Sequence, residues 1–262
     1  MQASTTMTAF KSTHSEDSLQ RTGKEPIKAE VIDGFDGIAR RYDLLTRMNP
    51  GYMKHLRWSA RRLALGPNAR ILDLCCGTGS STTGLIKTYP DAKEIVGLDA
   101  SAGMLGEARK AHRQTHVSFV HGNAMDPVSS GIEGPFDGIL MAYGIRNMPD
   151  ADTCLANLLP LLRPGGKIVF HEYSVADSKI ATGLWNAVSL GIILPSGLAF
   201  TGRTDIWTYL RKSVLEFDGV RAFESRLRRA GFVDVETLGM DGWQKEVVHS
   251  FIARRPMTEA NA

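Results

Sequence analysis

Short apolar runs alternate with amphipathic segments through the middle of the chain. The apolar runs cover residues 70–75, 94–99, 117–121, 136–142 and 167–171. The segments between them place apolar residues at helical spacing, as Met104, Leu105 and Ala108 do within Ser101–His112. This alternation predicts an α/β fold, with a mostly parallel sheet and helices on both of its faces.

The pattern changes at both ends of this core. Amphipathic helices are expected within residues 30–66, and a helix at Val220–Ala230 precedes two late strands near 233–238 and 247–253. The run Leu184–Phe200 is apolar but too short and too broken to span a bilayer as one helix. We expect it to belong to a helical cap packed on the core. The alternative is a surface that faces a membrane or a second copy of the chain.

The same pattern divides the chain into one folded domain with extensions. The segments are a polar tail (1–29), a helical lid (30–66), an α/β domain with seven strands (67–254) that contains the cap insertion (175–217), and a C-terminal tail (255–262).

Composition narrows the class of protein only slightly. The chain has 262 residues, 43% of them hydrophobic, and a net charge of +3, which is too mild to indicate nucleic acid as a partner. Its three cysteines, Cys75, Cys76 and Cys154, lack disulfide or zinc spacing, and no ligand set for a metal is visible. The N-terminus carries no apolar signal segment. We expect a cytoplasmic protein, either free or peripheral to a membrane.

The strongest chemical signal is a glycine turn after the first strand. Cys75-Cys76-Gly77-Thr78-Gly79 follows residues 70–74, and Asp99 ends the second strand. Glycines let the backbone approach a ligand, and a carboxylate at the second position can accept hydrogen bonds from both ribose hydroxyls. A nucleoside-containing cofactor is therefore expected at this edge of the sheet.

Two details favour one such cofactor. Thr82 stands where a dinucleotide fingerprint has its third glycine, and no Gly-Lys-Ser/Thr follows the turn. Asp73, just before the turn, would repel a phosphate but suits the ammonium and sulfonium of S-adenosylmethionine. S-adenosylmethionine is therefore the expected cofactor, and an NAD(P) oxidoreductase is the alternative.

Several further runs carry a family resemblance. They are Tyr42-Asp43, His55 with Trp58, Tyr143-Gly144-Ile145-Arg146-Asn147, Leu162-Arg163-Pro164-Gly165-Gly166-Lys167, Glu172-Tyr173-Ser174 and Asp205–Leu210. Together they resemble the UbiE-type ubiquinone/menaquinone C-methyltransferases over roughly residues 33–254. The resemblance implies a Rossmann-like class I methyltransferase that uses S-adenosylmethionine. The chain departs from the family pattern at Cys75-Cys76, at His171 and in a segment one residue longer before His55, so the quinone acceptor is less firmly implied than methyl transfer.

The cofactor residues follow from the resemblance and from the turn. By position, the resemblance assigns Thr78, Asp99, Asn123, Ala124 and Ala142 to the cofactor. To these we add Gly77, Gly79, Asp73, Ala100, Met104 and, as a side chain that closes over the cofactor or acceptor, Tyr42. Three of them have structural alternatives: an Asx turn for Asn123, capping of the turn's N–H groups for Asp73, and simple core packing for Met104.

Three residues are candidates for the chemistry. Methylation of a carbon requires a phenolate or enolate, whose oxygen Arg146 would stabilise with Asn147 as a hydrogen-bonding neighbour. The resemblance implies instead that Arg146 is a base acting through water, but a guanidinium pKa above about 12 favours the electrostatic role. A structural salt bridge is its alternative. His171 is the candidate base for the departing proton, and a purely structural strand-end histidine is the other interpretation.

Taken together, the residues predict S-adenosylmethionine-dependent C-methylation of a lipophilic small molecule, prenylated or not. The departures from the family favour a secondary metabolite over a quinone-pathway intermediate. The alternatives are a quinone-pathway methyltransferase proper and a non-catalytic cofactor-binding assembly subunit. We expect a homo-oligomer and no nucleic-acid partner. The basic helix face with Arg57, Arg61 and Arg62 is expected to be solvated or to meet anionic lipid headgroups.

Overall fold

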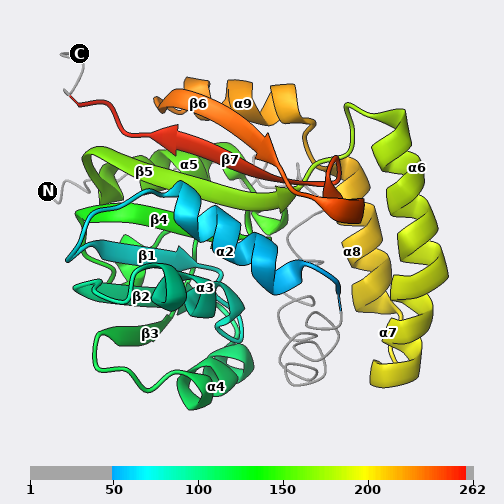
Figure 1. Ribbon diagram of the computed structural model, residues 1–262, viewed down its shortest axis with the longest axis horizontal. Coiled ribbons are helices and arrows are strands. Elements are labelled where there is room, and N and C mark those ends of the chain that lie inside the picture. Colours follow the sequence, from blue (N-terminus) through cyan, green and yellow to red (C-terminus); the bar gives the residue numbers. More distant parts are fainter. Residues whose placement is uncertain (1–48, 258–262) are drawn as a thin grey trace, which may run out of the picture.

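The computed structural model describes residues 49–257. The N-terminal tail, the first part of the expected lid and Tyr42 lie outside the described residues. Seven strands form one sheet in the order β3-β2-β1-β4-β5-β7-β6 (Figure 1). The strands are β1 (Arg70–Leu74), β2 (Glu94–Asp99), β3 (Val117–His121), β4 (Phe136–Ala142), β5 (Leu162–Tyr173), β6 (Val233–Gly239) and β7 (Val248–Arg254). Only β7 runs antiparallel to its neighbours, so the predicted mostly parallel sheet is confirmed.

Strand β5 is longer than the expected run 167–171. Pro164 and the following glycines resemble a turn in the sequence, but Leu162 already pairs with Phe136 of β4 before a register shift. The Gly165 N–H donates to the Arg255 carbonyl at 3.0 Å, which anchors the glycine segment across the sheet. Pairing with distant segments therefore extends the strand through residues that locally favour a turn.

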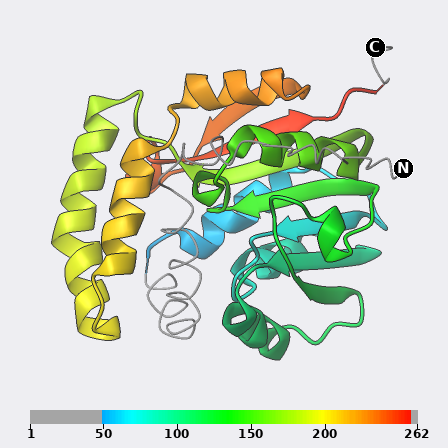
Figure 2. The ribbon, with the colours of Figure 1, turned by 180° about the vertical axis from the view of Figure 1, so that it is seen from behind.

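Helices cover both faces of the sheet (Figures 1 and 2). They are α2 (Tyr52–Arg62), α3 (Ser80–Thr88), α4 (Ala102–Ala111), α5 (Ala151–Leu158), α6 (Lys179–Val188), α7 (Leu194–Thr201), α8 (Asp205–Glu216) and α9 (Val220–Arg229). Helices α2 and α3 pack on one face through Ala60 and Leu85, and α5 and α9 pack on the other through Leu158 and Phe223. The layers form because each helix buries one apolar stripe against the strands.

Two of the three arginines of α2 hydrogen-bond to other segments of the protein. Arg62 donates to the Leu238 and Gly239 carbonyls at 3.1 and 2.9 Å, and Arg57 donates to the Lys87 carbonyl at 3.5 Å. His55, buried on the same helix, hydrogen-bonds to Gln244 and Asp241. These contacts tie α2 to neighbouring elements, so this helix face is a packed surface as much as a solvated one.

The insertion 175–217 forms helices that stand beyond the carboxyl ends of the parallel strands (Figure 1). A π-helical turn, η5 (Ser189–Ile193), joins α6 to α7, and α8 packs beside them. Trp185 of α6 is fully buried and donates from Nε1 to the Arg211 carbonyl at 3.3 Å. Trp207 of α8 donates to the Thr201 hydroxyl at 3.2 Å. The inner side of the insertion is therefore packed on the molecule, as expected for a cap.

Candidate active site

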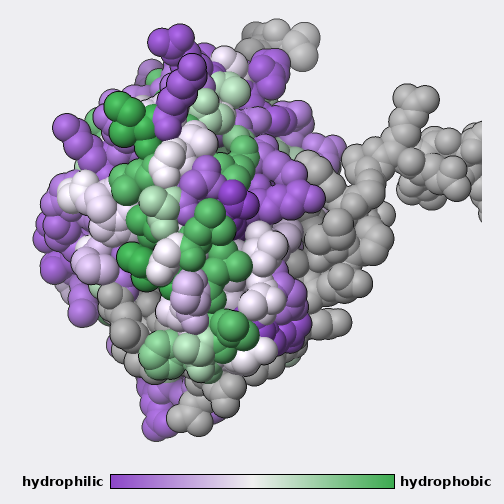
Figure 3. Space-filling model, turned by 90° about the vertical axis from the view of Figure 1, so that its right-hand side faces the viewer, coloured by the Kyte–Doolittle hydropathy of each residue, from purple (hydrophilic) through white to green (hydrophobic). Residues whose placement is uncertain are grey.

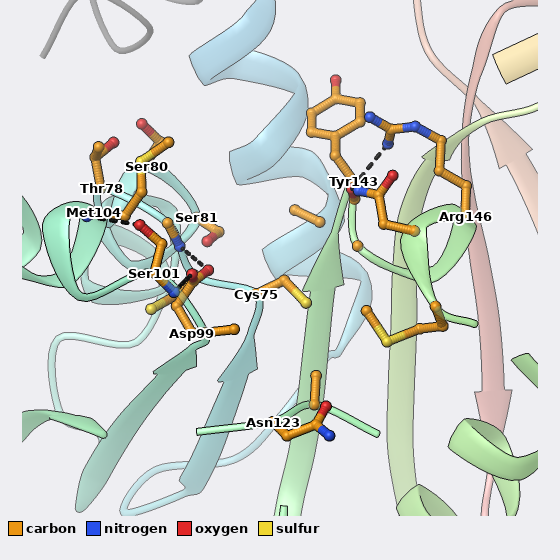
Figure 4. A pocket seen from close by; sticks show the side chains of 18 of the residues that line it. Cys75, Thr78, Ser80, Ser81, Asp99, Ser101, Met104, Asn123, Tyr143 and Arg146 are labelled. Carbon is orange, nitrogen blue, oxygen red and sulfur yellow. Dashed lines mark hydrogen bonds between the residues drawn. The ribbon is translucent and has the colours of Figure 1, made fainter. Parts of the chain in front are cut away.

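A cavity of about 640 Å³ opens at the carboxyl ends of β1, β2 and β4. The glycine turn and Asp99 form one side, Tyr143 and Arg146 form the other, and Cys75 lies between them (Figure 4). The cavity lies beside β1, which the chain leaves for β2 on one side and, after β3, passes again to form β4 on the other side. This switch point is the usual ligand site of an open α/β sheet.

The turn leaves room for a ligand at Gly77. Its φ is +56°, and a Cβ built there would meet no atom within 4 Å, so the open space lies on the cavity side of the backbone. Gly79 has a φ of +85°, but a Cβ there would lie 2.7 Å from the His112 ring. Gly79 does not line the cavity, and its role is to supply the left-handed backbone conformation of the turn.

Asp99 joins the turn to the start of the next helix. Its Oδ2 accepts from the Gly77 N–H at 2.9 Å, and its Oδ1 accepts from the Ser101 N–H at 2.8 Å (Figure 4). Each carboxylate oxygen can accept more than one hydrogen bond, so these contacts fix the group without exhausting it. Asp99 also lines the cavity, as predicted, in a position to accept from ligand hydroxyls.

The part of the cavity beyond Asp99 is mostly apolar. Met104 and Ala124 line it and are only about 5% exposed, and Ala100 and Ala142 line it as predicted. Asn123 also lines it, while its Oδ1 accepts from the Met125 N–H at 2.9 Å. The Asx turn considered as an alternative is therefore present, and the Asn123 amide nitrogen is the group that can donate to a flat heterocycle.

Asp73 does not line the cavity, which rules out a direct contact with a ligand there; a contact with the methionyl ammonium through water stays a prediction. Asp73 is fully buried behind the turn, where its Oδ2 accepts from the Ser81 and Thr82 hydroxyls at 2.9 and 2.6 Å. Burial, with a smaller contribution from the charge of Asp99, raises the pKa of Asp73 to about 7 against the lowering by the hydroxyls of Thr82 and Ser81. Asp73 thus ties β1 to the first turn of α3 by side-chain contacts rather than by capping backbone N–H groups.

Arg146 lines the other side of the cavity from a short helical turn, η3 (Ile145–Asn147). Its Nη1 donates to the Tyr143 carbonyl at 2.8 Å and to Glu172 Oε1 at 2.7 Å. Glu172 is fully buried, and burial raises its pKa against the lowering effect of Arg146. The expected alternative, a structural salt bridge, is therefore present. Held in this geometry by Glu172, Arg146 can act on a ligand by a directed hydrogen bond.

Tyrosines that sequence reasoning missed surround this end of the cavity. Tyr209 of α8 donates to Asn147 Oδ1 at 3.1 Å, and Asn147 donates to the Tyr143 carbonyl at 3.1 Å. Tyr52 stacks on Tyr143, with ring centroids 5.9 Å apart and an interplanar angle of 6°. Tyr143 and Tyr209 both lie inside runs that carried the family resemblance, which was the signal available for finding them.

His171 does not reach the cavity, which corrects its expected role as a base. The ring is fully buried, with Nδ1 2.7 Å from the Ser59 hydroxyl and Nε2 2.9 Å from the Tyr143 hydroxyl. Burial, with smaller contributions from His55 and Arg62, lowers the pKa of His171 to about 3. His171 is therefore neutral near pH 7, and the contact with Tyr143 makes it a support for the cavity wall.

The cysteines that replace the family's small residues before the turn are not reactive groups. Cys75 lines the cavity and Cys76 is buried. Burial raises the pKa of both thiols well above the ordinary value. Since the thiolate is the nucleophilic form of cysteine, neither side chain is suited to covalent chemistry near neutral pH.

The arrangement fits S-adenosylmethionine. The open backbone at Gly77, the acceptor Asp99 and the apolar wall of Met104 and Ala124 match, in order, the methionyl part, the ribose and the adenine of that cofactor. Among the described residues 49–257, this side of the cavity is lined by no Lys or Arg, which a pyrophosphate would favour.

Comparison with known proteins agrees with this fit. The model of the ubiE/COQ5 methyltransferase family matches residues 23–242. The demethylmenaquinone methyltransferase of Geobacillus sp. (strain WCH70) is 32% identical over 210 residues, which cover 77% of this chain and 88% of that protein. The ubiquinone/menaquinone biosynthesis C-methyltransferase UbiE of Nitrobacter hamburgensis is 31% identical over 218 residues, which cover 79% and 85%.

Solved structures share the fold at lower identity. The N-methyltransferase NodS of Bradyrhizobium japonicum, in complex with S-adenosyl-L-homocysteine, superposes with a TM-score of 0.55 at 18% identity over 79% of this chain and 89% of that one. The [4+2]-cyclase SpnF superposes with a TM-score of 0.60 at 16% identity over 88% and 97%. Such likeness shows the fold and leaves the reaction to the site and the closer relatives. The chain belongs to the ubiE/COQ5 methyltransferase family and is a methyltransferase that depends on S-adenosylmethionine.

Proposed function

We propose that the chain methylates a ring carbon of a quinone-pathway intermediate, a reduced aromatic ring with a lipophilic tail. The observation that carries the proposal is the similarity to demethylmenaquinone methyltransferases, 32% identity over 77% of the chain, together with the residues that line the acceptor end. This proposal replaces the expected preference for a secondary metabolite, because the departures at Cys75-Cys76 and His171 bring neither a reactive thiol nor a base to the cavity.

The acceptor end of the cavity suits a flat phenolic ring. Tyr52, Tyr143 and Tyr209 offer aromatic surface, and Met148 with Pro149 adds apolar wall. Arg146, held in place by Glu172, offers a hydrogen bond to the ring oxygen on which negative charge develops. Asn147 is held by Tyr209 and supports the same turn.

The chemistry is an in-line displacement. S-adenosylmethionine supplies an electrophilic methyl group on its sulfonium when bound. The chain's own residues must hold the acceptor carbon about 3–3.5 Å from that methyl group and exclude water. The acceptor hydroxyl loses its proton to water to give the electron-rich ring. The new carbon–carbon bond forms as the methyl–sulfur bond breaks, S-adenosylhomocysteine is the leaving group, and the ring C–H proton passes to water as aromaticity is restored. Arg146, held by Glu172, acts at the first stage by donating a hydrogen bond to the phenolate oxygen.

A comparison of acceptors tests the substrate class. The purified protein is incubated with methyl-labelled S-adenosylmethionine and either demethylmenaquinol or the same naphthohydroquinone without its isoprenoid tail. We expect kcat/KM for the tailed acceptor to exceed that for the bare ring by at least about tenfold, because the tail adds buried apolar surface. Equal values would remove the lipophilic tail from the proposal, and transfer to neither would remove the quinone class.

A further inference from the structure

The outward side of α6, η5 and α7 is an exposed apolar surface, here named the outer face. It comprises Ile180, Leu184, Leu190, Ile192, Leu198 and Phe200. Ile180 of α6 is 79% exposed and Ile192 of η5 is 62% exposed, so large aliphatic side chains are exposed along the whole length of this face. A space-filling view of this side shows a band of apolar residues running along the helices (Figure 3). Contiguous apolar surface of this kind marks a contact with another body.

The outer face differs from an ordinary helix surface in its lack of charge. Residues 180–202 contain no Asp, Glu, Lys or Arg. By length and composition, Lys179–Thr201 could cross a membrane, and only 17% of its most apolar window is buried. It lies along the molecule instead, because Trp185 on its inner side packs on Tyr173 and bonds to α8. An apolar helix fixed flat on a protein can enter a bilayer only sideways.

Charges at the margins indicate what the outer face meets. Lys179 and Arg203 stand at the two ends of the uncharged stretch, and Arg203 forms an ion pair with Asp205. Residues 179–216 carry four basic and two acidic side chains. Basic groups around an apolar helix are the arrangement that binds anionic headgroups while the apolar side chains enter the interface. A second copy of the chain would bring the same segment, with its excess of basic over acidic groups, against itself.

We infer that the outer face seats the protein on the surface of an anionic phospholipid bilayer. The consequence for the site follows from α8, which lies between the outer face and the cavity. Trp207 of α8 packs on the inner side of α7, whereas Tyr209 of the same helix lines the cavity. When the outer face contacts the bilayer, α8 therefore lies between the lipid and the acceptor end of the cavity. The docking itself does not depend on the proposed acceptor.

Vesicle flotation tests the inference without acceptor or cofactor. The full chain is mixed with vesicles of phosphatidylcholine and phosphatidylglycerol, and the floated fraction is measured for the wild type and for Ile192→Glu/Leu198→Glu. The matched control is Val128→Glu, which changes an equally exposed apolar side chain, 60% exposed, in the segment Val128–Ser130 outside the outer face. S-adenosylmethionine binding by each variant confirms that the fold is intact.

The wild type and Val128→Glu should float alike. The double variant should bind at least about tenfold more weakly, because two side chains that enter the bilayer interface become charged. Binding should also fall when phosphatidylglycerol is omitted. Equal flotation of the double variant, or no flotation of the wild type, would overturn the inference. A wild-type dimer that becomes monomeric in the double variant, as measured by light scattering, would also overturn it, because the outer face would then contact a second copy of the chain. None of these outcomes bears on methyl transfer, which is assayed separately.

Discussion

Asp99 links cofactor recognition to the shape of the turn. Replacing Asp99 by Ala removes the acceptor for a ribose and for the Gly77 and Ser101 N–H groups. We expect the affinity for S-adenosylmethionine to fall by about 1.5–3 kcal/mol, the scale of charge-assisted hydrogen bonds. Isothermal titration calorimetry measures it, with Asp126→Ala, an exposed acid outside the cavity, as the control. Unchanged affinity in Asp99→Ala would contradict the assignment.

His171 supports Tyr143 rather than moving a proton through the cavity. With its pKa lowered to about 3, His171 stays neutral through the working range, so no step of the pH–rate profile between pH 5 and 8 should belong to it. His171→Gln should therefore lower kcat while leaving the shape of that profile unchanged. Tyr143→Phe, which removes the same hydrogen bond, should behave alike. If His171→Gln alone removed the fall of the rate at low pH, His171 would be the base after all.

The element that positions the site is the turn between β1 and α3. Gly79→Ala should destabilise it, because the φ of +85° and the His112 ring at 2.7 Å both oppose a Cβ. Gly106→Ala in α4 is the matched control, since a Cβ there meets nothing within 4 Å. We expect the control to gain about 0.5–1 kcal/mol in free energy of unfolding and Gly79→Ala to lose at least as much. Urea unfolding measures both, and a gain in Gly79→Ala would contradict the turn geometry.

Asp73 gives the same junction a pH dependence. Burial raises its folded pKa to about 7 from an ordinary value near 3.8, so its contribution to stability is fully present below pH 3.8 and is lost as the pH rises through 7. Asp73→Asn keeps an oxygen acceptor for the hydroxyls of Ser81 and Thr82 but cannot ionise. Relative to the wild type, this variant should gain stability as the pH rises from 5 to 8, measured by thermal unfolding without cofactor. A constant difference across that range would show that Asp73 is ionised when buried.

The elements of this fold were largely predictable, whereas the contacts of individual side chains were not. Strands such as Phe136–Ala142 are apolar runs bounded by turn residues, and the local signal agrees with the sheet. The extension of β5 to Leu162 depends on pairing with Phe136, which local sequence does not encode. Likewise, the partners of His171 come from α2 and from the loop after β4. Sequence places such a residue at a strand end but cannot say which distant groups surround it.

At the scale of the whole molecule, one side of the cavity is formed by residues close together in the sequence and the other by residues far apart in it. The side with Gly77 and Asp99 is a local motif of strand, turn and helix, so the sequence revealed it. The side with Arg146 and Tyr209 is assembled from η3, the end of β5 and the cap helix α8, segments far apart in the chain. The cap thus completes the cavity on one side and presents the outer face on the other.

Single-turnover transfer from methyl-labelled S-adenosylmethionine to demethylmenaquinol tests the central claim most directly. The wild type should place the label on a ring carbon of the organic-phase product, as mass spectrometry can show. Arg146→Ala, with S-adenosylmethionine affinity nearly intact, should transfer it about 100-fold more slowly, because the developing oxyanion loses its hydrogen-bond donor. Label on oxygen, or no label from a protein that binds the cofactor, would contradict the account.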